Sequence, residues 1–355
     1  MDIATERLVR TFLVGPRKKS ARELVHALGA VQSQDYEGAK WAISQRTSLN
    51  NEAIENEFTR GALLRTHVLR PTWHFVDPAD IRWMLRLTAP RIMTIMSTYG
   101  RKLGLDEKVY RRSNAVIAKA LRDHNYLTRN ELKMIRTKAN FGPLPGERLA
   151  RLVMRAETDA VICSGPRRGK QFTYALLDER APAVAARDRD ADLEDLTLRY
   201  FRGRSPATAH DFAWWSGLSM RDVKRGIEIA GTQLEPCTID GTTFWRVPDS
   251  FGPPGPSAHL LPNYDEFFIG YRDRSAIGKR IGSVTAVTGG STLIANVLMV
   301  DGQLVGGWKR RLEGERITVE ASVLTRLSRS ERKRLIEAAR AFQEFEHREV
   351  RVTGL

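Results

Sequence analysis

The stretch SARELVHALG, residues 20–29, decides the fold, because patterns of the same kind return twice later in the chain. Its first residue, Ser, and its fourth, Glu, have the spacing of a capping box. In that motif the hydroxyl and the carboxylate satisfy free backbone N–H groups at the start of a helix. The stretch therefore predicts a helix that begins after Ser20 and ends at Gly29.

Further helices and a strand pair are expected around this one. Apolar residues at helical spacing predict a helix before it, and Gly15-Pro16 stops that helix. Two more helices are expected near residues 39–43 and 51–59, and then two short strands at residues 63–69 and 72–76. Helices followed by a strand pair are typical of a winged helix-turn-helix.

The same order of signals occurs two more times. The run TRNEL at residues 128–132 follows an apolar-striped helix and precedes another helix, two strands and a basic loop, GPRRGK at 165–170. The runs TAHDF at 208–212 and SMRD at 219–222 come next, before a hairpin whose turn is Asp240-Gly241. Three similar units predict a repeat architecture.

We therefore predict an α+β fold, with three tandem winged helix-turn-helix repeats in a concave arrangement and a C-terminal β-rich, barrel-like region. The expected units cover residues 1–100, 101–190 and 191–250, and residues 251–355 form a linker and the last domain. The segment 250–262 holds four prolines and two glycines, which marks a linker or a rigid extended crossing. Beyond it we expect a closing helix, capped at Ser328, after strands at 284–288, 292–300, 303–309 and 316–323.

Charge narrows the choice of partner. Lysine and arginine total 57 against 42 aspartates and glutamates, a net charge of +15, which suits a polyanion. No segment approaches the roughly 18 consecutive apolar residues of a membrane helix. The first residues are typical of an amphipathic helix rather than a secretory signal. Charge favours a nucleic acid as the partner and leaves a membrane surface as the weaker alternative, because no isolated basic amphipathic segment with exposed aromatics occurs. We therefore expect a cytoplasmic protein.

Several kinds of chemistry are excluded by missing motifs. Cys163 and Cys237 lie far apart and outside any ligand cluster, so both are predicted to be reduced thiols. No HExxH, GxSxG or acidic EF-hand loop occurs, and we expect neither a metal nor a cofactor. Residues 165–171, GPRRGKQ, resemble a P-loop but are one residue short between the glycines. Glutamine also stands where Ser or Thr should bind magnesium, so nucleotide hydrolysis is excluded.

Two pairs of polar residues leave alternatives open. His67 and His74 are expected on neighbouring strands without metal-ligand spacing. His74 is then either a polar residue on a groove-facing strand or a hydrogen-bonded structural histidine. Asp265 and Glu266 are either a general-base pair or, as we favour, structural ion-pair partners of Arg272 and Arg274.

Three stretches together resemble the AlkZ-like DNA glycosylases. They are QSQD at residues 32–35, RTHVLRPTWH at 65–74 and LLPNYDEFFIGYRDR at 260–274. The resemblance spans nearly the whole chain, including the order of repeats and the β-rich C-terminal region. It implies tandem winged helices and excision of bulky alkylated bases, including those in interstrand crosslinks. With this resemblance we expect a nucleoid-associated monomer that binds double-stranded DNA and no membrane.

The resemblance assigns catalysis to Gln32 and Gln34, since active members of that family carry Gln-x-Gln or Gln-x-Asp around an apolar residue. Ser33 departs from this pattern. A glutamine carbonyl can accept a hydrogen bond from water, and its amide can donate to a phosphate or sugar oxygen. An N7-alkylated purine is cationic and its glycosidic bond already activated, so the pair needs only to position water and stabilise an oxocarbenium-like sugar.

These observations predict a monofunctional DNA repair glycosylase that hydrolyses the N-glycosidic bond of N7-alkylated purines, including bulky or crosslinked adducts. The alternative is a non-catalytic winged-helix DNA-binding protein or transcriptional regulator. Side chains on wings and hairpins are expected to contact DNA, mostly by neutralising phosphates. They are His74, Arg167, Arg168, Lys170, Lys309, Arg310 and Arg311.

Overall fold

The helix predicted after Ser20 is present as α2 (Ala21–Leu28), with its apolar face buried and its end at Gly29. The Ser20 hydroxyl accepts the N–H of Glu23, whereas the Glu23 carboxylate accepts the N–H of Lys19. Only the hydroxyl half of the predicted capping box therefore forms. The computed structural model describes residues 2–183, 185, 187–249, 251–284 and 296–355.

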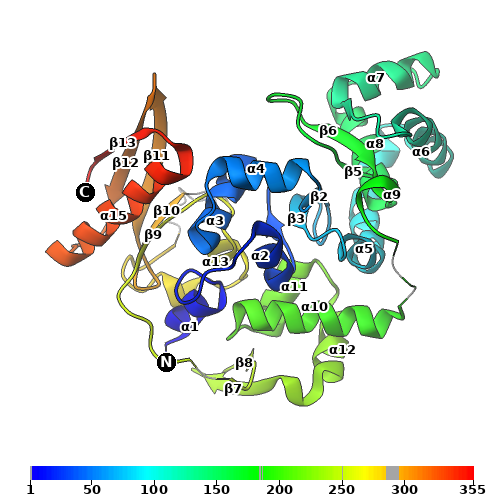
Figure 1. Cartoon of the computed structure of the whole chain (residues 1–355). Helices are drawn as coiled ribbons and strands as arrows, with labels where there is room; N and C mark the ends of the chain where they lie inside the picture. Colours follow the sequence, from blue (N-terminus) through cyan, green and yellow to red (C-terminus); the bar gives the residue numbers. More distant parts are fainter. Residues whose placement is uncertain (1, 184, 186, 250, 285–295) are drawn as a thin grey trace.

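The first unit surrounds α2 and lies at the centre of the molecule (Figure 1). Its three-stranded antiparallel sheet has the order β1-β3-β2. The predicted helices and the predicted strand pair are confirmed. The elements are α1 (Ile3–Arg10), β1 (Val31–Gln32), α3 (Tyr36–Thr47), α4 (Asn51–Thr59), β2 (Leu64–His67) and β3 (Trp73–Val76).

One long helix, α5 (Ile81–Lys102), was not anticipated from the sequence pattern. The side chain of Asp80, at the N-cap position, accepts no hydrogen bond from the first turn of this helix. Pro90 lies inside the helix, where a proline usually indicates a helix end. Its buried first half packs into the central core, and its second half extends to α8 of the second unit. The helix therefore joins the first two units.

The second unit repeats the topology of the first. Its sheet has the order β4-β6-β5, again antiparallel, and Thr128 and Glu131 form the predicted capping box. The basic loop predicted as a wing connects β5 to β6. The elements are α6 (Glu107–Leu121), β4 (Leu127–Thr128), α7 (Arg129–Lys138), α8 (Gly146–Thr158), β5 (Ile162–Ser164), β6 (Thr173–Leu176) and α9 (Leu177–Arg180).

The third unit has three helices and a hairpin. Thr208 and Asp211 form another capping box, and the hairpin turns at Asp240-Gly241, where both residues have positive φ. A single bridge, Ala207 to Trp245, occupies the place that a first strand has in the other two units. The elements are α10 (Arg189–Arg204), α11 (Ala209–Ser216), α12 (Met220–Ala230), β7 (Glu235–Ile239) and β8 (Thr242–Arg246).

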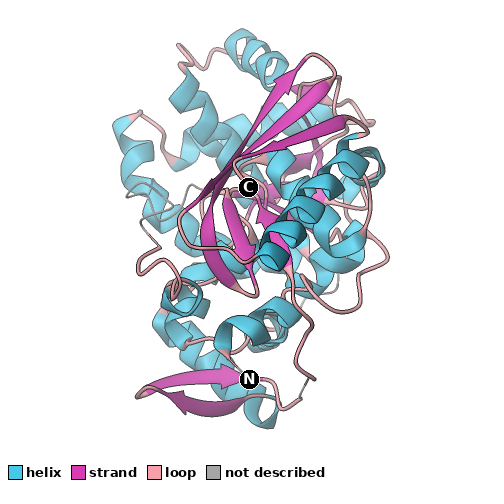
Figure 2. Cartoon of the chain, turned by 90° about the vertical axis from the view of Figure 1, so that its left-hand side faces the viewer, coloured by secondary structure: helices cyan, strands magenta, loops and turns pink. Residues whose placement is uncertain are grey.

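The C-terminal region is an open five-stranded sheet of order β13-β12-β11-β10-β9, with α15 (Arg329–Glu346) packed against it (Figure 2). Ser328 and Glu331 cap α15 as predicted. The first strand lies within the proline-rich segment expected as a linker or extended crossing, and the strand expected at 284–288 lies outside the described residues except for Val284. The strands are β9 (Ala258–Leu261), β10 (Val297–Val300), β11 (Gln303–Glu313), β12 (Arg316–Val323) and β13 (Glu349–Thr353).

The architecture is thus α+β, as predicted, with a curved sheet rather than a closed barrel at its end. Edge strands β9 and β13 do not pair with each other, and β13 joins β12 in parallel. Among the helices that the structure describes, none is long and apolar enough to cross a membrane.

Candidate active site and nucleic-acid interface

Gln32 belongs to a row of polar side chains that crosses the first sheet. Its Cα pairs with that of His74 on β3, which in turn pairs with Thr66 on β2. Residues paired in this way project from the same face of a sheet. Gln32 is only 5 % exposed, and His74 and Thr66 are fully buried. Within the described part of the chain, Gln32 Oε1, His74 Nε2 and Thr66 Oγ1 have no hydrogen-bond partner.

His74 is neutral in this row. Its Nδ1 lies 3.0 Å from the carbonyl oxygen of Thr72, so Nδ1 carries the hydrogen and Nε2 is an acceptor. Burial, and secondarily the nearby Arg70 cation, lower the pKa of His74 well below its usual value. The expectation that this ring faces a groove is wrong, because none of its surface is exposed. The alternative, a hydrogen-bonded structural histidine, fits this position.

Gln34 lies two residues further on and is exposed. Its Oε1 accepts the N–H of Trp73 at 3.4 Å, a long and weak hydrogen bond. Asp35 follows and caps α3 by accepting the N–H of Gly38. The two glutamines therefore differ in environment, since the Gln34 carboxamide reaches solvent and the Gln32 carboxamide is almost covered.

Ser33, between the two glutamines, is fully buried and bound to Arg65. Arg65 Nη2 donates to the Ser33 carbonyl oxygen at 3.0 Å, and Nε lies 3.2 Å from both that oxygen and the hydroxyl oxygen. The guanidinium stacks on Trp73 and Phe172 at 4.5 and 4.6 Å from the ring centroids. Burial lowers the pKa of Arg65 to about 10, still far above neutrality.

Asp265 and Glu266 are buried ion-pair partners, as favoured from the sequence, but their partners are not Arg272 and Arg274. Asp265 binds Arg46 through two hydrogen bonds of 2.8 and 2.9 Å. Glu266 accepts from Arg204, at 2.6 Å, and from the indole of Trp215. Its other oxygen accepts the backbone N–H of Gln32 at 2.8 Å, so this carboxylate holds the backbone of β1 in place.

A basic groove of about 580 Å³ lies between the β5–β6 loop and the C-terminal hairpin. The tips of both hairpins lie on the same side of the molecule, at the top of Figure 1. Four of the arginines and lysines predicted to contact DNA line this groove, together with Arg348, which the sequence reasoning missed. Glu37, three residues after Gln34, also lines it. The four predicted residues are Arg167, Lys170, Arg310 and Arg311.

The other two predicted cations lie outside the groove lining. Arg168 is more than half exposed and binds Glu131 and the carbonyl oxygen of Tyr126. Lys309 is exposed on β11, opposite Glu320 on β12. Within the groove, carboxylates partly neutralise the arginines, since Arg167 lies 3.4 Å from Glu37 and 3.5 Å from Glu55.

One group of described side chains, His26, Asp77 and Asp80, has the composition of a metal site. Arg22 and Arg199 form ion pairs with the two carboxylates. Hydrogen bonds to both aspartates raise the pKa of His26 to about 9, so the imidazole is protonated and cannot ligate a cation at neutral pH. These residues fit an ion-pair network better than a metal site.

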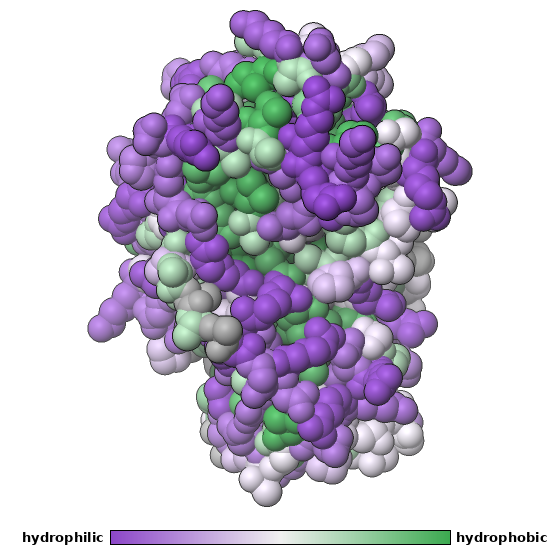
Figure 3. Space-filling view, turned by 90° about the vertical axis from the view of Figure 1, so that its right-hand side faces the viewer, coloured by the Kyte–Doolittle hydropathy of each residue, from purple (hydrophilic) through white to green (hydrophobic). Residues whose placement is uncertain are grey.

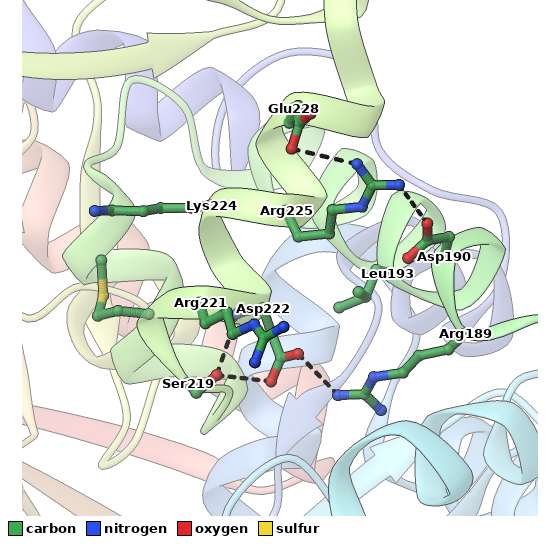
Figure 4. Close-up of a pocket in the computed structure, with 10 residues that line it drawn as sticks. Arg189, Asp190, Leu193, Ser219, Arg221, Asp222, Lys224, Arg225 and Glu228 are labelled. Carbon is green, nitrogen blue, oxygen red and sulfur yellow. Dashed lines mark hydrogen bonds and ion pairs between the residues drawn. The ribbon is translucent and has the colours of Figure 1, made fainter.

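Another hollow, of about 980 Å³, lies between α10 and α12 of the third unit (Figure 4). Its arginines are mostly engaged, because Arg189 pairs with Asp222 and Arg225 pairs with Asp190. Lys224 extends away from these pairs. None of the residues that line this hollow comes from the first unit, so it is separate from the glutamines.

The face of the molecule that carries the second unit is partly apolar. A band of apolar residues runs between polar ones there (Figure 3). A groove of about 500 Å³ lies between α5 and the second unit. Methionines of α5 and α8 contribute to its lining, and Ile95 and Tyr99 on α5 are about half exposed.

Comparison with known protein families assigns the chain to one of them. The model of the family described as DNA glycosylase AlkZ-like matches residues 25–345, and the chain belongs to this family.

Two comparisons relate the chain to particular proteins. It is 23 % identical over 322 residues to an interstrand DNA cross-link repair glycosylase of Streptomyces sahachiroi, with 85 % of each chain covered. The solved structure of the Streptomyces sahachiroi DNA glycosylase AlkZ superposes with a TM-score of 0.81 at 21 % identity. That match covers 99 % of this chain and 98 % of the other. It establishes the shared fold.

Proposed function

We propose that this protein is a DNA glycosylase that hydrolyses the N-glycosidic bond of N7-alkylated purines, including bulky or crosslinked adducts. Gln32 and Gln34 are the residues that act on the sugar and the water. The observation that carries the proposal is the exposed Gln34 side chain. It lies just before the N-cap of α3, and the first turn of this helix contributes Glu37 to the basic groove. Family membership and the relative named as a cross-link repair glycosylase support it.

The reaction requires little acid catalysis. Water forms a bond to C1′ while the C1′–N9 bond breaks. The electron pair of the C1′–N9 bond stays on N9 and cancels the positive charge of the alkylated purine. The proton of the attacking water passes to solvent, because an amide is too weak a base to keep it. Gln34 Oε1 has only a weak 3.4 Å contact to exchange for a water, and neutral amides do not repel the DNA phosphates as a carboxylate would.

The proposed DNA-binding mode uses the repeats as a cradle. We interpret the three units as winged helix-turn-helix repeats. The strand orders β1-β3-β2 and β4-β6-β5 support this for the first two units, and the hairpin β7-β8 with the bridge from Ala207 to Trp245 supports it for the third. Double-stranded DNA would then lie along the groove between the β5–β6 wing and the β11–β12 hairpin. The three units and the C-terminal domain, with the boundaries given above, act together in a monomer that works without a metal or cofactor.

A non-catalytic DNA-binding protein is the second candidate, and two observations favour it. Gln32 is almost covered, so its carboxamide reaches a nucleotide only if the site opens when DNA binds. Ser33 also replaces the apolar residue of the family motif. This candidate predicts salt-dependent duplex binding that Gln32→Ala and Gln34→Ala leave unchanged.

Base release decides between the two. Duplex DNA containing N7-methylguanine is incubated with the protein, and the free base is quantified. We expect release by the unaltered protein, and its loss in Gln34→Ala without loss of duplex affinity. A duplex with a bulky N7 adduct and one with an interstrand crosslink serve as further substrates. No release from any of the three would leave the DNA-binding protein as the function.

A further inference from the structure

We propose that Arg65 is a positioning residue for the segment from Gln32 to Gln34, an inference that rests on the proposed glycosylase function. Its guanidinium holds the Ser33 carbonyl and hydroxyl oxygens and so fixes the backbone from which both glutamine side chains project. Arg65 itself touches neither water nor sugar. Ser33, the residue that departs from the family motif, supplies the additional hydroxyl contact.

The backbone of this short segment is held at three points. The N–H of Gln32 donates to Glu266, and the N–H of Ser33 donates to the carbonyl oxygen of Trp73 at 2.8 Å. The third point is the Ser33 carbonyl oxygen, which Arg65 binds from two nitrogens. Because β1 ends at Gln32, the third contact replaces strand pairing that the sheet no longer supplies there.

Arg65 lies on the opposite side of the strand from Gln32. Successive side chains along a strand point to opposite faces, and Arg65 pairs across the sheet with Phe75, which pairs with Val31. Ser33 therefore faces Arg65, while the row that begins at Gln32 faces away. Such a group can set the direction of the carboxamides without contact with the reacting atoms.

Arg65 is itself held firmly. It is 8 % exposed, and its backbone N–H donates to the hydroxyl of Ser164 in the second unit. None of the carboxylates in the described residues forms an ion pair with it, so its hydrogen bonds go to Ser33 rather than to an acid. Trp73 and Phe172 contact its planar cation. Lysine cannot reproduce this fork and stack, because its ammonium is a compact point charge.

The test separates rate from binding. Single-turnover release of N7-methylguanine and duplex affinity are measured for the unaltered protein and for Arg65→Lys, Ser33→Ala and the double variant. We expect Arg65→Lys to lower the rate by about 10- to 100-fold, because small misplacements of reacting groups have effects of this size. Affinity for the duplex should stay unchanged. Ser33→Ala should lower the rate less, and the double variant should be no slower than Arg65→Lys alone.

Arg180→Lys is the matched control. Arg180 also joins the second unit to the first, through the carbonyl oxygens of Phe58 and Thr59, but it does not contact the glutamine segment. It should keep the rate of the unaltered protein. An unchanged rate in Arg65→Lys, or equal rate losses in both lysine variants, would overturn the positioning role. If the unaltered protein releases no base, the proposed function itself fails.

Discussion

Removal of the Asp265 carboxylate should strongly destabilise the fold. Asp265 and Arg46 form a fork of two hydrogen bonds at 2.8 and 2.9 Å, with 0 % and 2 % of their side chains exposed. Asp265→Ala leaves the Arg46 cation buried without a counter-charge, which costs ~3–5 kcal/mol for a broken buried pair. Asp265 also accepts the N–H of Phe267 at the start of a short helix, α13 (Glu266–Ile269).

The size of this loss is checked by urea denaturation followed by circular dichroism. The matched control is Glu349→Ala, which breaks the exposed pair of Glu349 with Arg316, whose side chains are 65 % and 47 % exposed. An exposed pair is worth ~1 kcal/mol or less, so this variant should unfold almost as the unaltered protein does. Equal losses in the two variants would refute the reasoning that burial, rather than pairing, sets the magnitude.

Three further predictions concern pH, salt and packing. Because the folded pKa of His26 is raised to about 9, its stabilising contribution is complete below its ordinary value of 6.5 and is lost as pH rises through 9. Thermal denaturation between pH 6 and 10 should show this loss, and His26→Ala should flatten the curve. Lys170→Ala and Arg311→Ala should each make the slope of log affinity against log salt less steep by ~1, measured by fluorescence anisotropy on duplex DNA. Gly306→Ala should lower the melting temperature, because its Cβ would lie 2.1 Å from the Ser322 carbonyl oxygen; an unchanged temperature would contradict the close approach of β11 and β12.

Local sequence signals predicted much of the secondary structure. The caps at Thr128, Thr208 and Ser328 begin helices in the structure, because a cap acts within one turn and needs no distant partner. The turn at Asp240-Gly241 formed for the same reason. Helix α5 was not predicted because no local signal marks its start. It is stabilised by burial of its first half against residues that are distant in the sequence.

The sequence by itself determined the starts of the capped helices, the basic charge and the resemblance that singled out Gln32 and Gln34. Only the tertiary structure decided which charges are partnered, because Asp265 and Glu266 meet Arg46 and Arg204 from segments far away in the chain. It also separated the two glutamines into a covered and an exposed one. Burial and long-range pairing depend on how distant segments pack, and that information is not contained in any short stretch of sequence.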